Sequence, residues 1–201
     1  MKKFLALGSF LTLFSPVNAG SFYVTLSGGI SSLNDIELEI INEPDESTDL
    51  SSDDGFNGEF GIGYDFENTI RTDITYSISN HDGITANGTD TGADGEFSNV
   101  SFNIYKDFEL DNSKFTPYIG AGFGSSTISL NDSNGELDFV DDSSISYQVK
   151  VGSSYAVSKK ANLFLEGAYI KPSRFTVKDK GDINIETDAM AYKAGFRFNF
   201  N

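Results

Sequence analysis

The strongest constraint on the fold is a pattern of alternating side chains that recurs eight times after residue 20. In each segment apolar residues occupy every second position, and small or polar residues lie between them, as in 70–79, which reads IRTDITYSIS. This is the periodicity of a β-strand with two different faces. Each segment is about as long as a tilted membrane strand, and none approaches the roughly 20 apolar residues of a membrane helix. The pattern predicts an all-β fold of eight strands.

The predicted connections alternate strictly between long and short. Successive connections of an up-and-down barrel lie at opposite ends, so one end would carry the long loops. This asymmetry is typical of bacterial outer-membrane barrels, whose long loops are extracellular. We therefore expect residues 20–201 to form an eight-stranded antiparallel up-and-down transmembrane β-barrel; a secreted soluble β-barrel is the alternative. The long connections are 31–54, 80–95, 126–143 and 172–187, and the short ones 65–69, 107–114 and 156–161.

Residues 1–19 have the form of a secretory signal peptide. Lys2 and Lys3 precede a mostly apolar stretch over 4–14, and Val17-Asn18-Ala19 resembles a cleavage site. The apolar stretch is too short to span a bilayer of roughly 30 Å as a helix. We expect cleavage after Ala19.

Composition excludes several classes of function. Asp and Glu number 30 against 14 Lys plus Arg, for a net charge of −16, which offers no basic footprint for nucleic acid. There is no Cys, so disulfides, thiolate nucleophiles and Cys-based zinc sites are ruled out. No cofactor is implied. A closed barrel satisfies its backbone without a partner chain, so a monomer is expected.

The C-terminal sequence resembles the assembly signal of outer-membrane barrels. Lys193, Gly195, Phe198 and Phe200 fill its polar, glycine and two aromatic places, although Asn201 follows where the aromatic is usually last. The stretch 116–124, TPYIGAGFG, is similar to a strand of small OmpA-like, Opa-like and surface-antigen barrels, and 146–152 and 162–167 resemble the hairpin that follows. The resemblance implies insertion by the outer-membrane assembly machinery, contact with lipid and lipopolysaccharide, and both termini in the periplasm.

The face expected to line the lumen carries charges of both signs. In a narrow interior such charges must pair or cost several kcal/mol each, so we interpret them as a salt-bridge plug. The alternative is a charge ladder that passes small ions. A wide aqueous pore is not expected, because that takes roughly 16 strands or more. The residues are Glu59, Arg71, Asp73, Lys150, Glu166, Lys193 and Arg197.

Acidic residues concentrate in the predicted long loops. The range 31–54 contains nine and 126–143 five, with no Lys or Arg in either. We interpret them as a solvated coat; the oxygen-rich segment 131–138 is an alternative calcium site, although it lacks full EF-hand spacing. Ile36, Leu38 and Ile40 alternate with glutamates, so the first hairpin is expected to continue beyond the membrane. Basic residues of the fourth loop could contact lipopolysaccharide phosphates or the acidic first loop: Lys171, Arg174, Lys178 and Lys180.

Three functions remain open at this point. The favoured one is a structural and surface-recognition role, in which the loops contact an extracellular ligand. The second is a narrow channel for small ions or solutes. The third is lipid-modifying catalysis, which needs a His with a nucleophile or carboxylate partner. His81 is the sole candidate base, and its place at the start of the range 80–95 predicts a solvated loop histidine. We expect no enzymatic activity.

Overall fold

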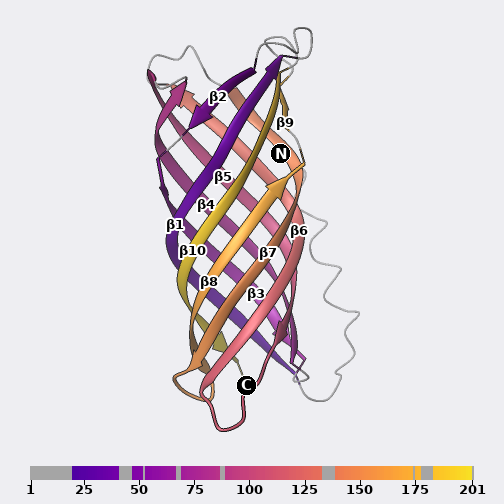
Figure 1. Cartoon of the computed structure of the whole chain (residues 1–201). Coiled ribbons are helices and arrows are strands. Elements are labelled where there is room, and N and C mark those ends of the chain that lie inside the picture. Colours follow the sequence, from indigo (N-terminus) through magenta and orange to yellow (C-terminus); the bar gives the residue numbers. More distant parts are fainter. Residues whose placement is uncertain are drawn as a thin grey trace, which may run out of the picture.

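A computed structural model describes residues 20–40, 47–51, 53–66, 69–86, 89–132, 139–173, 175–177 and 183–200. Eight long strands form a closed antiparallel barrel, and two short strands, β2 and β9, extend it at one end (Figure 1). The predicted eight-stranded barrel is confirmed. The strands are β1 (Ser21–Ile40), β2 (Ser47–Ser51), β3 (Gly55–Asp65), β4 (Ile70–Ala86), β5 (Thr89–Asp107), β6 (Phe115–Asp132), β7 (Phe139–Ala156), β8 (Ala161–Pro172), β9 (Phe175–Val177) and β10 (Ile183–Asn199).

The barrel closes through pairing of its first and last strands. Tyr23 of β1 pairs with Asn199 of β10, and the ladder continues to Ile30 and Tyr192 and beyond. The other edge of β1 pairs with β3. Closure gives the backbone groups of this region partners within the sheet, which the interior of a bilayer demands. Among the described residues no helix is long and apolar enough to cross a membrane.

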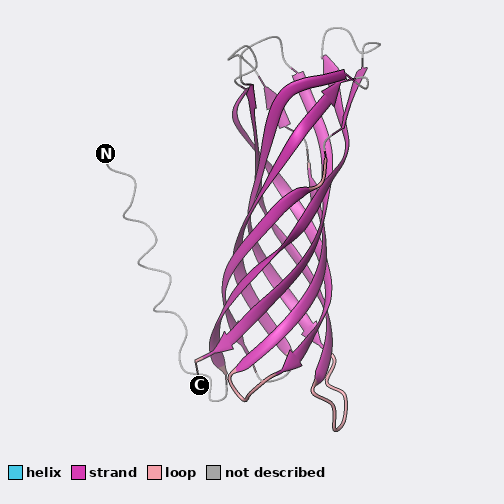
Figure 2. Cartoon of the chain, turned by 90° about the vertical axis from the view of Figure 1, so that its left-hand side faces the viewer, coloured by secondary structure: helices cyan, strands magenta, loops and turns pink. Residues whose placement is uncertain are grey.

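The short connections agree with the sequence, and the long ones do not. Short connections separate β3 from β4, β5 from β6 and β7 from β8, as predicted. The ranges 31–54, 80–95, 126–143 and 172–187, however, are largely strand, because β1, β4 and β6 run on to Ile40, Ala86 and Asp132. The first hairpin does continue as paired strand, with Ile36 paired to Leu50; that this part lies beyond the membrane stays a prediction. The result is a tall barrel whose three short connections all lie at one end (Figure 2).

The face of the sheet that carries the apolar side chains changes along the barrel. Over the half nearer the short turns, apolar residues face outward, and Leu26, Ile74 and Leu165 are each at least 60% exposed. Toward the opposite end the interior instead holds an apolar cluster, which we call the upper core. It consists of Leu33, Phe97, Ile128, Ile170, Phe175 and Ala189.

Candidate functional site

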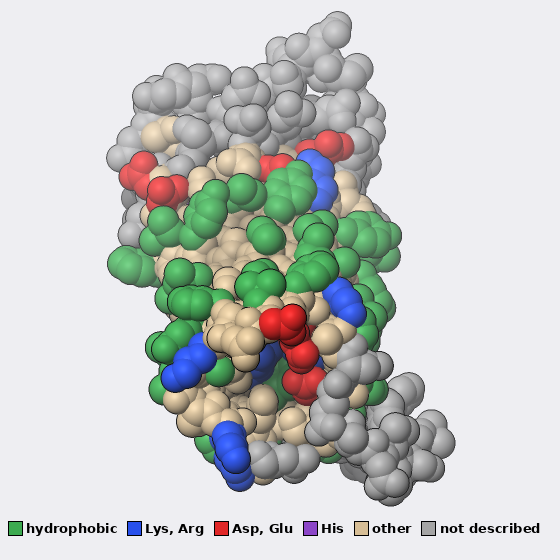
Figure 3. Space-filling model, turned by 60° about the horizontal axis from the view of Figure 1, so that its bottom comes forward, with side chains coloured by type: hydrophobic (Ala, Val, Ile, Leu, Met, Phe, Trp, Pro, Cys, Tyr) green, Lys and Arg blue, Asp and Glu red, His purple; other side chains and the backbone are tan. Residues whose placement is uncertain are grey.

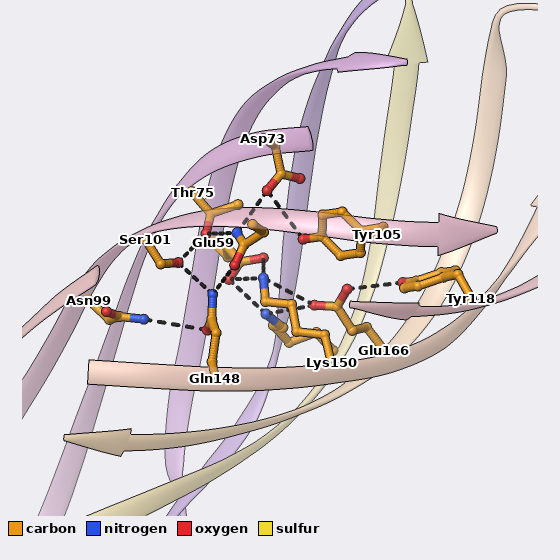
Figure 4. Close-up of polar contacts among 12 residues, drawn as sticks. Glu59, Asp73, Thr75, Asn99, Ser101, Tyr105, Tyr118, Gln148, Lys150 and Glu166 are labelled. Atoms are coloured by element: carbon orange, nitrogen blue, oxygen red, sulfur yellow. Dashed lines mark hydrogen bonds and ion pairs between the residues drawn. The ribbon is translucent and has the colours of Figure 1, made fainter. Parts of the chain in front are cut away.

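Four charged side chains from four strands meet near the middle of the barrel (Figure 4). Lys150 Nζ of β7 lies 3.1 Å from both oxygens of Glu59 on β3, and Lys193 Nζ of β10 lies 2.8 Å from Glu59 Oε2. Glu166 Oε1 of β8 lies 3.1 Å from Lys193 Nζ and 3.5 Å from Lys150 Nζ. Two carboxylates thus alternate with two ammonium groups, and all four residues are buried. We call this arrangement the charge cluster.

These residues converge because each occupies a position of its strand whose side chain points into the lumen. Lys193 and Glu166 are direct cross-strand partners on β10 and β8, so their stems are held side by side. Glycines on the inner face provide the space. A Cβ on Gly122 would lie 2.0 Å from Asn103 Oδ1, so a side chain at this position would displace a lumen residue. Tyr118 completes the site by donating its hydroxyl to Glu166 Oε2 at 3.0 Å.

Asp73 is held by neutral donors. Its carboxylate accepts from Asn103 Nδ2 at 2.8 Å, from the Tyr23 hydroxyl at 3.1 Å and from the Tyr105 hydroxyl at 3.2 Å. These three hydrogen bonds compensate part of the cost of burying the carboxyl group. Asp73 therefore belongs to a second, mostly uncharged part of the predicted network.

Arg71 occupies a separate site nearer the short turns. Its Nε donates to both oxygens of Asp107 at 3.0 and 3.1 Å. The guanidinium carbon lies 4.0 Å from the ring centroid of Tyr105 and 4.5 Å from that of Tyr118, within cation–π range of both. Arg197 lies in the same region, 5.7 Å from the ring centroid of Tyr23. The sequence interpretation missed Asp107, because it falls at the start of a predicted short connection.

A layer of amides and hydroxyls fills the lumen on the other side of the charge cluster. Gln148 Nε2 donates to Ser101 Oγ and Asn103 Oδ1, while Asn99 Oδ1 accepts from Ser146 Oγ at 3.1 Å and Ser126 Oγ at 3.3 Å. Amide and hydroxyl side chains are common on solvated surfaces. In the sequence, this layer could have been predicted only from the fact that its members all occupy inward-facing positions of their strands.

His81 is not a solvated loop residue, and that expectation was wrong. It lies on β4 with its side chain fully buried. Nδ1 is 3.2 Å from the Asp53 carbonyl oxygen, and Nε2 is 3.0 Å from Ser31 Oγ and 3.1 Å from Ser79 Oγ. A carbonyl oxygen only accepts, so Nδ1 carries the proton and Nε2 accepts from the serines. The imidazole thereby joins β1, β4 and the segment before β3.

A small cavity lies beside the charge cluster. A cavity of about 10 Å³ adjoins Arg71, Asp73, Tyr105, Glu166 and Arg197. That is about the space that a single water molecule requires. Along its length the described lumen contains four layers: aromatic and basic groups, the charge cluster, the amide and hydroxyl layer, and the upper core.

The family model of the outer membrane protein beta-barrel domain matches residues 4–200. The chain belongs to this family of outer membrane β-barrels. Its similarity to solved structures extends over almost the whole chain. The Neisserial surface protein A shares 20% identity, with 91% of this chain and 100% of that one covered and a TM-score of 0.65. OprG from Pseudomonas aeruginosa shares 17% identity over 91% and 97%, with a TM-score of 0.67.

A third outer membrane β-barrel, AlkL, was solved in lipid bilayers. It shares 16% identity over 94% of this chain and 93% of that one, with a TM-score of 0.57. No curated protein sequence matches the chain. At these identities the structural likeness shows the fold alone, so the role of this outer membrane β-barrel has to be argued from its own residues.

The four residues of the predicted assembly signal take different positions in this outer membrane β-barrel. Lys193 belongs to the charge cluster, and Gly195 lies under Phe164, whose Cζ would be 2.3 Å from an added Cβ. Phe198 and Phe200 pack edge to face with ring centroids 5.6 Å apart. Their exposed rings lie near the end of β10, but recognition by the assembly machinery stays a prediction.

Several expectations lie wholly or partly outside the described residues. They are the signal peptide 1–19, most of the oxygen-rich segment 131–138, and Arg174, Lys178 and Lys180 of the fourth predicted loop. Within the described part of the chain, no group of three or more His, Asp or Glu side chains has a geometry suited to a metal ion.

Proposed function

We propose that this outer membrane β-barrel is a closed scaffold that recognises ligands at the cell surface through the end opposite its short turns. The observation that carries the proposal is strand length. β5 has 19 residues and β6 and β7 have 18 each, whereas a tilted membrane strand needs about 9–11. The remaining residues of each strand extend the paired sheet beyond the membrane. In this proposal the short turns are periplasmic and the extended end is extracellular.

The composition of the extended end indicates the chemistry of a ligand. The sequence places nine Asp and Glu in 31–54 and five in 126–143, without a Lys or Arg in either range. Such an end attracts partners that carry basic groups, and it attracts them less as salt screens the charges. Catalysis is not part of the proposal, because both ring nitrogens of His81 face protein groups inside the barrel.

Recognition is tested by shortening the extended end. In one variant, a two-residue turn replaces 36–50, which removes the outer part of β1 together with β2. We expect the variant to keep the gel-mobility shift of a folded barrel, but cells displaying it should lose adhesion to surfaces coated with basic peptides. Wild-type adhesion should weaken as salt is raised from 0.05 to about 0.5 M, where the screening length falls well below ~10 Å. Equal adhesion by both proteins would refute the proposal.

The competing function, a narrow channel for small ions, makes a different prediction. It is favoured by the charges of the lumen, but the cavity that adjoins these charges has a volume of only about 10 Å³, the space of about one water molecule. In a planar bilayer we expect no conductance above the protein-free baseline. A reproducible unitary conductance that changes with Lys150→Gln would instead support the channel.

A further inference from the structure

The outer surface of the barrel carries an open apolar groove. It has a volume of about 920 Å³ and crosses β7, β8, β10 and β1, where Leu26, Leu163, Leu165 and Phe196 form its walls. A second hollow of about 520 Å³ continues it, since both include Gly28, Leu165 and Ala194. Because apolar side chains face outward here, the groove opens toward the hydrocarbon of the membrane.

The groove forms where outward positions lack large side chains. Gly28 of β1 pairs with Ala194 of β10 on one side and with Gly58 of β3 on the other. A Cβ at Gly28, which lines both hollows, would have only the Asn57 carbonyl oxygen within 4 Å, at 3.7 Å. Nearby outward positions of β1 and β10 carry Leu26 and Phe196, which are 66% and 41% exposed and project beyond the backbone on either side of the groove.

Three exposed lysines flank the end of the groove nearest the short turns. Phe115 and Tyr155 line this end, and Lys114 Nζ lies 5.8 Å from the ring centroid of Tyr155. Lys159 and Lys160 lie in the β7–β8 connection, where Lys160 O accepts from Asn199 N of β10 at 2.8 Å. Exposed basic side chains are visible around this end of the molecule (Figure 3). The β7–β8 connection contains no acidic residue, although Glu109 and Asp111 lie in the β5–β6 connection.

We propose that this groove binds an anionic phospholipid of the leaflet at the short-turn end. An acyl chain fills the apolar groove, and the phosphate and its negative headgroup lie among Lys114, Lys159 and Lys160. An apolar channel with a cluster of positive charges at one end complements a lipid with an anionic headgroup. The proposal depends on membrane insertion and not on what the extended end recognises, so the two can fail separately.

Native mass spectrometry of the detergent-folded chain tests the site. The probes are phosphatidylglycerol and phosphatidylcholine with identical acyl chains, titrated against the wild type and four variants. A lysine near an anionic surface contributes about fivefold in affinity. We therefore expect the wild type to retain phosphatidylglycerol at least fivefold more tightly, and K114Q/K159Q/K160Q to lose that preference. Ala194→Leu fills the groove and should weaken both lipids.

Two variants serve as matched controls. Lys106→Gln removes an exposed lysine of the same end that lies on β5, and Ala121→Leu enlarges an exposed alanine of β6. Both should bind like the wild type. Equal retention of the two lipids by the wild type, or equal behaviour of Ala194→Leu and Ala121→Leu, would overturn the proposal. So would a wild-type dimer that Ala194→Leu separates, because the groove would then be filled by a second copy.

Folding of each variant is checked by the gel-mobility shift between boiled and unboiled samples. If Ala194→Leu does not fold, the triple lysine variant decides, since its substitutions lie in exposed positions outside the lumen. An unchanged preference for phosphatidylglycerol in that variant overturns the proposal, and loss of the preference supports it.

Discussion

The membrane-spanning part of the barrel and its extended end use opposite rules of burial. On β6, Ile119 faces outward with 49% exposure, whereas Ile128 faces the lumen with 5%. On β8, Leu165 is 68% exposed and Ile170 is 5% exposed. Within single strands, the apolar residues thus change from the outer face to the inner one.

The difference reflects the two solvents that surround one sheet. Beside lipid, apolar side chains lose nothing by facing outward, and polar groups are hydrogen-bonded inside. Beyond the lipid, water surrounds the barrel, so the hydrophobic effect drives apolar side chains inward, as in a soluble protein. The charge cluster and the upper core are the interiors that these two environments select.

The largest expected effect comes from breaking the charge cluster. Glu59→Gln leaves Lys150 and Lys193 with Glu166 as the one carboxylate of the cluster. Removing one partner of a buried ion pair costs about 3–5 kcal/mol, because the remaining charge stays buried. We expect that loss in the free energy of unfolding, measured by urea titration in lipid vesicles and followed by the gel-mobility shift.

Lys106→Gln is the control for this experiment, because it removes an exposed charge near the short turns. Its effect should stay below about 0.5 kcal/mol. If Glu59→Gln unfolds at the same urea concentration as the wild type, water reaches the cluster and the lumen is not closed.

The sequence predicted the membrane-spanning part well, because one rule of alternation holds throughout it. The three short connections and the inward placement of Glu59, Lys150, Glu166 and Lys193 follow directly from the period of two. Which charges pair was not predictable, since that depends on how strands far apart in sequence face each other across the lumen. Arg71 pairs with Asp107, for example, and not with another predicted member.

The extended end was misjudged because the alternation changes phase there. In β5, Val100 and Phe102 face outward but Phe97 faces inward, and an odd spacing separates the two sets. A search for one continuous alternation therefore stops near residue 96, and the rest was predicted as loop. In β4 the inward positions instead continue without a break from Ser77 and Ser79 to His81, which are all buried. His81 was predicted to be solvated because the strand was expected to end at Ser79, two residues too early for its side chain to be recognised as inward-facing.

A matched pair of isoleucines on β6 sharpens the comparison. Ile128→Ala removes buried atoms from the upper core and should cost about 2–3 kcal/mol, at the lower end of such substitutions. Ile119→Ala removes contacts with lipid, leaves no protein cavity and should cost less than about 1 kcal/mol. The same urea titration measures both. Equal costs would mean that the upper core is not packed more tightly than the lipid-facing surface.

An effect smaller than that of Ile128→Ala is expected at the join between the two regions. His81→Leu deprives Ser31, Ser79 and the Asp53 carbonyl of a shared partner. Ser79 can still donate to the Phe97 carbonyl oxygen, so the loss falls mainly on Ser31 and the Asp53 carbonyl. Loss of buried hydrogen bonds of this kind costs about 1–2 kcal/mol. His81→Gln keeps a donor and an acceptor and should recover part of that loss.

Hydrogen exchange at β1 and β4 localises the effect of His81→Leu. The expected result is faster exchange that is confined to the residues beyond Ser31 and Ser79. Uniform acceleration along both strands would instead show that His81 supports the whole barrel.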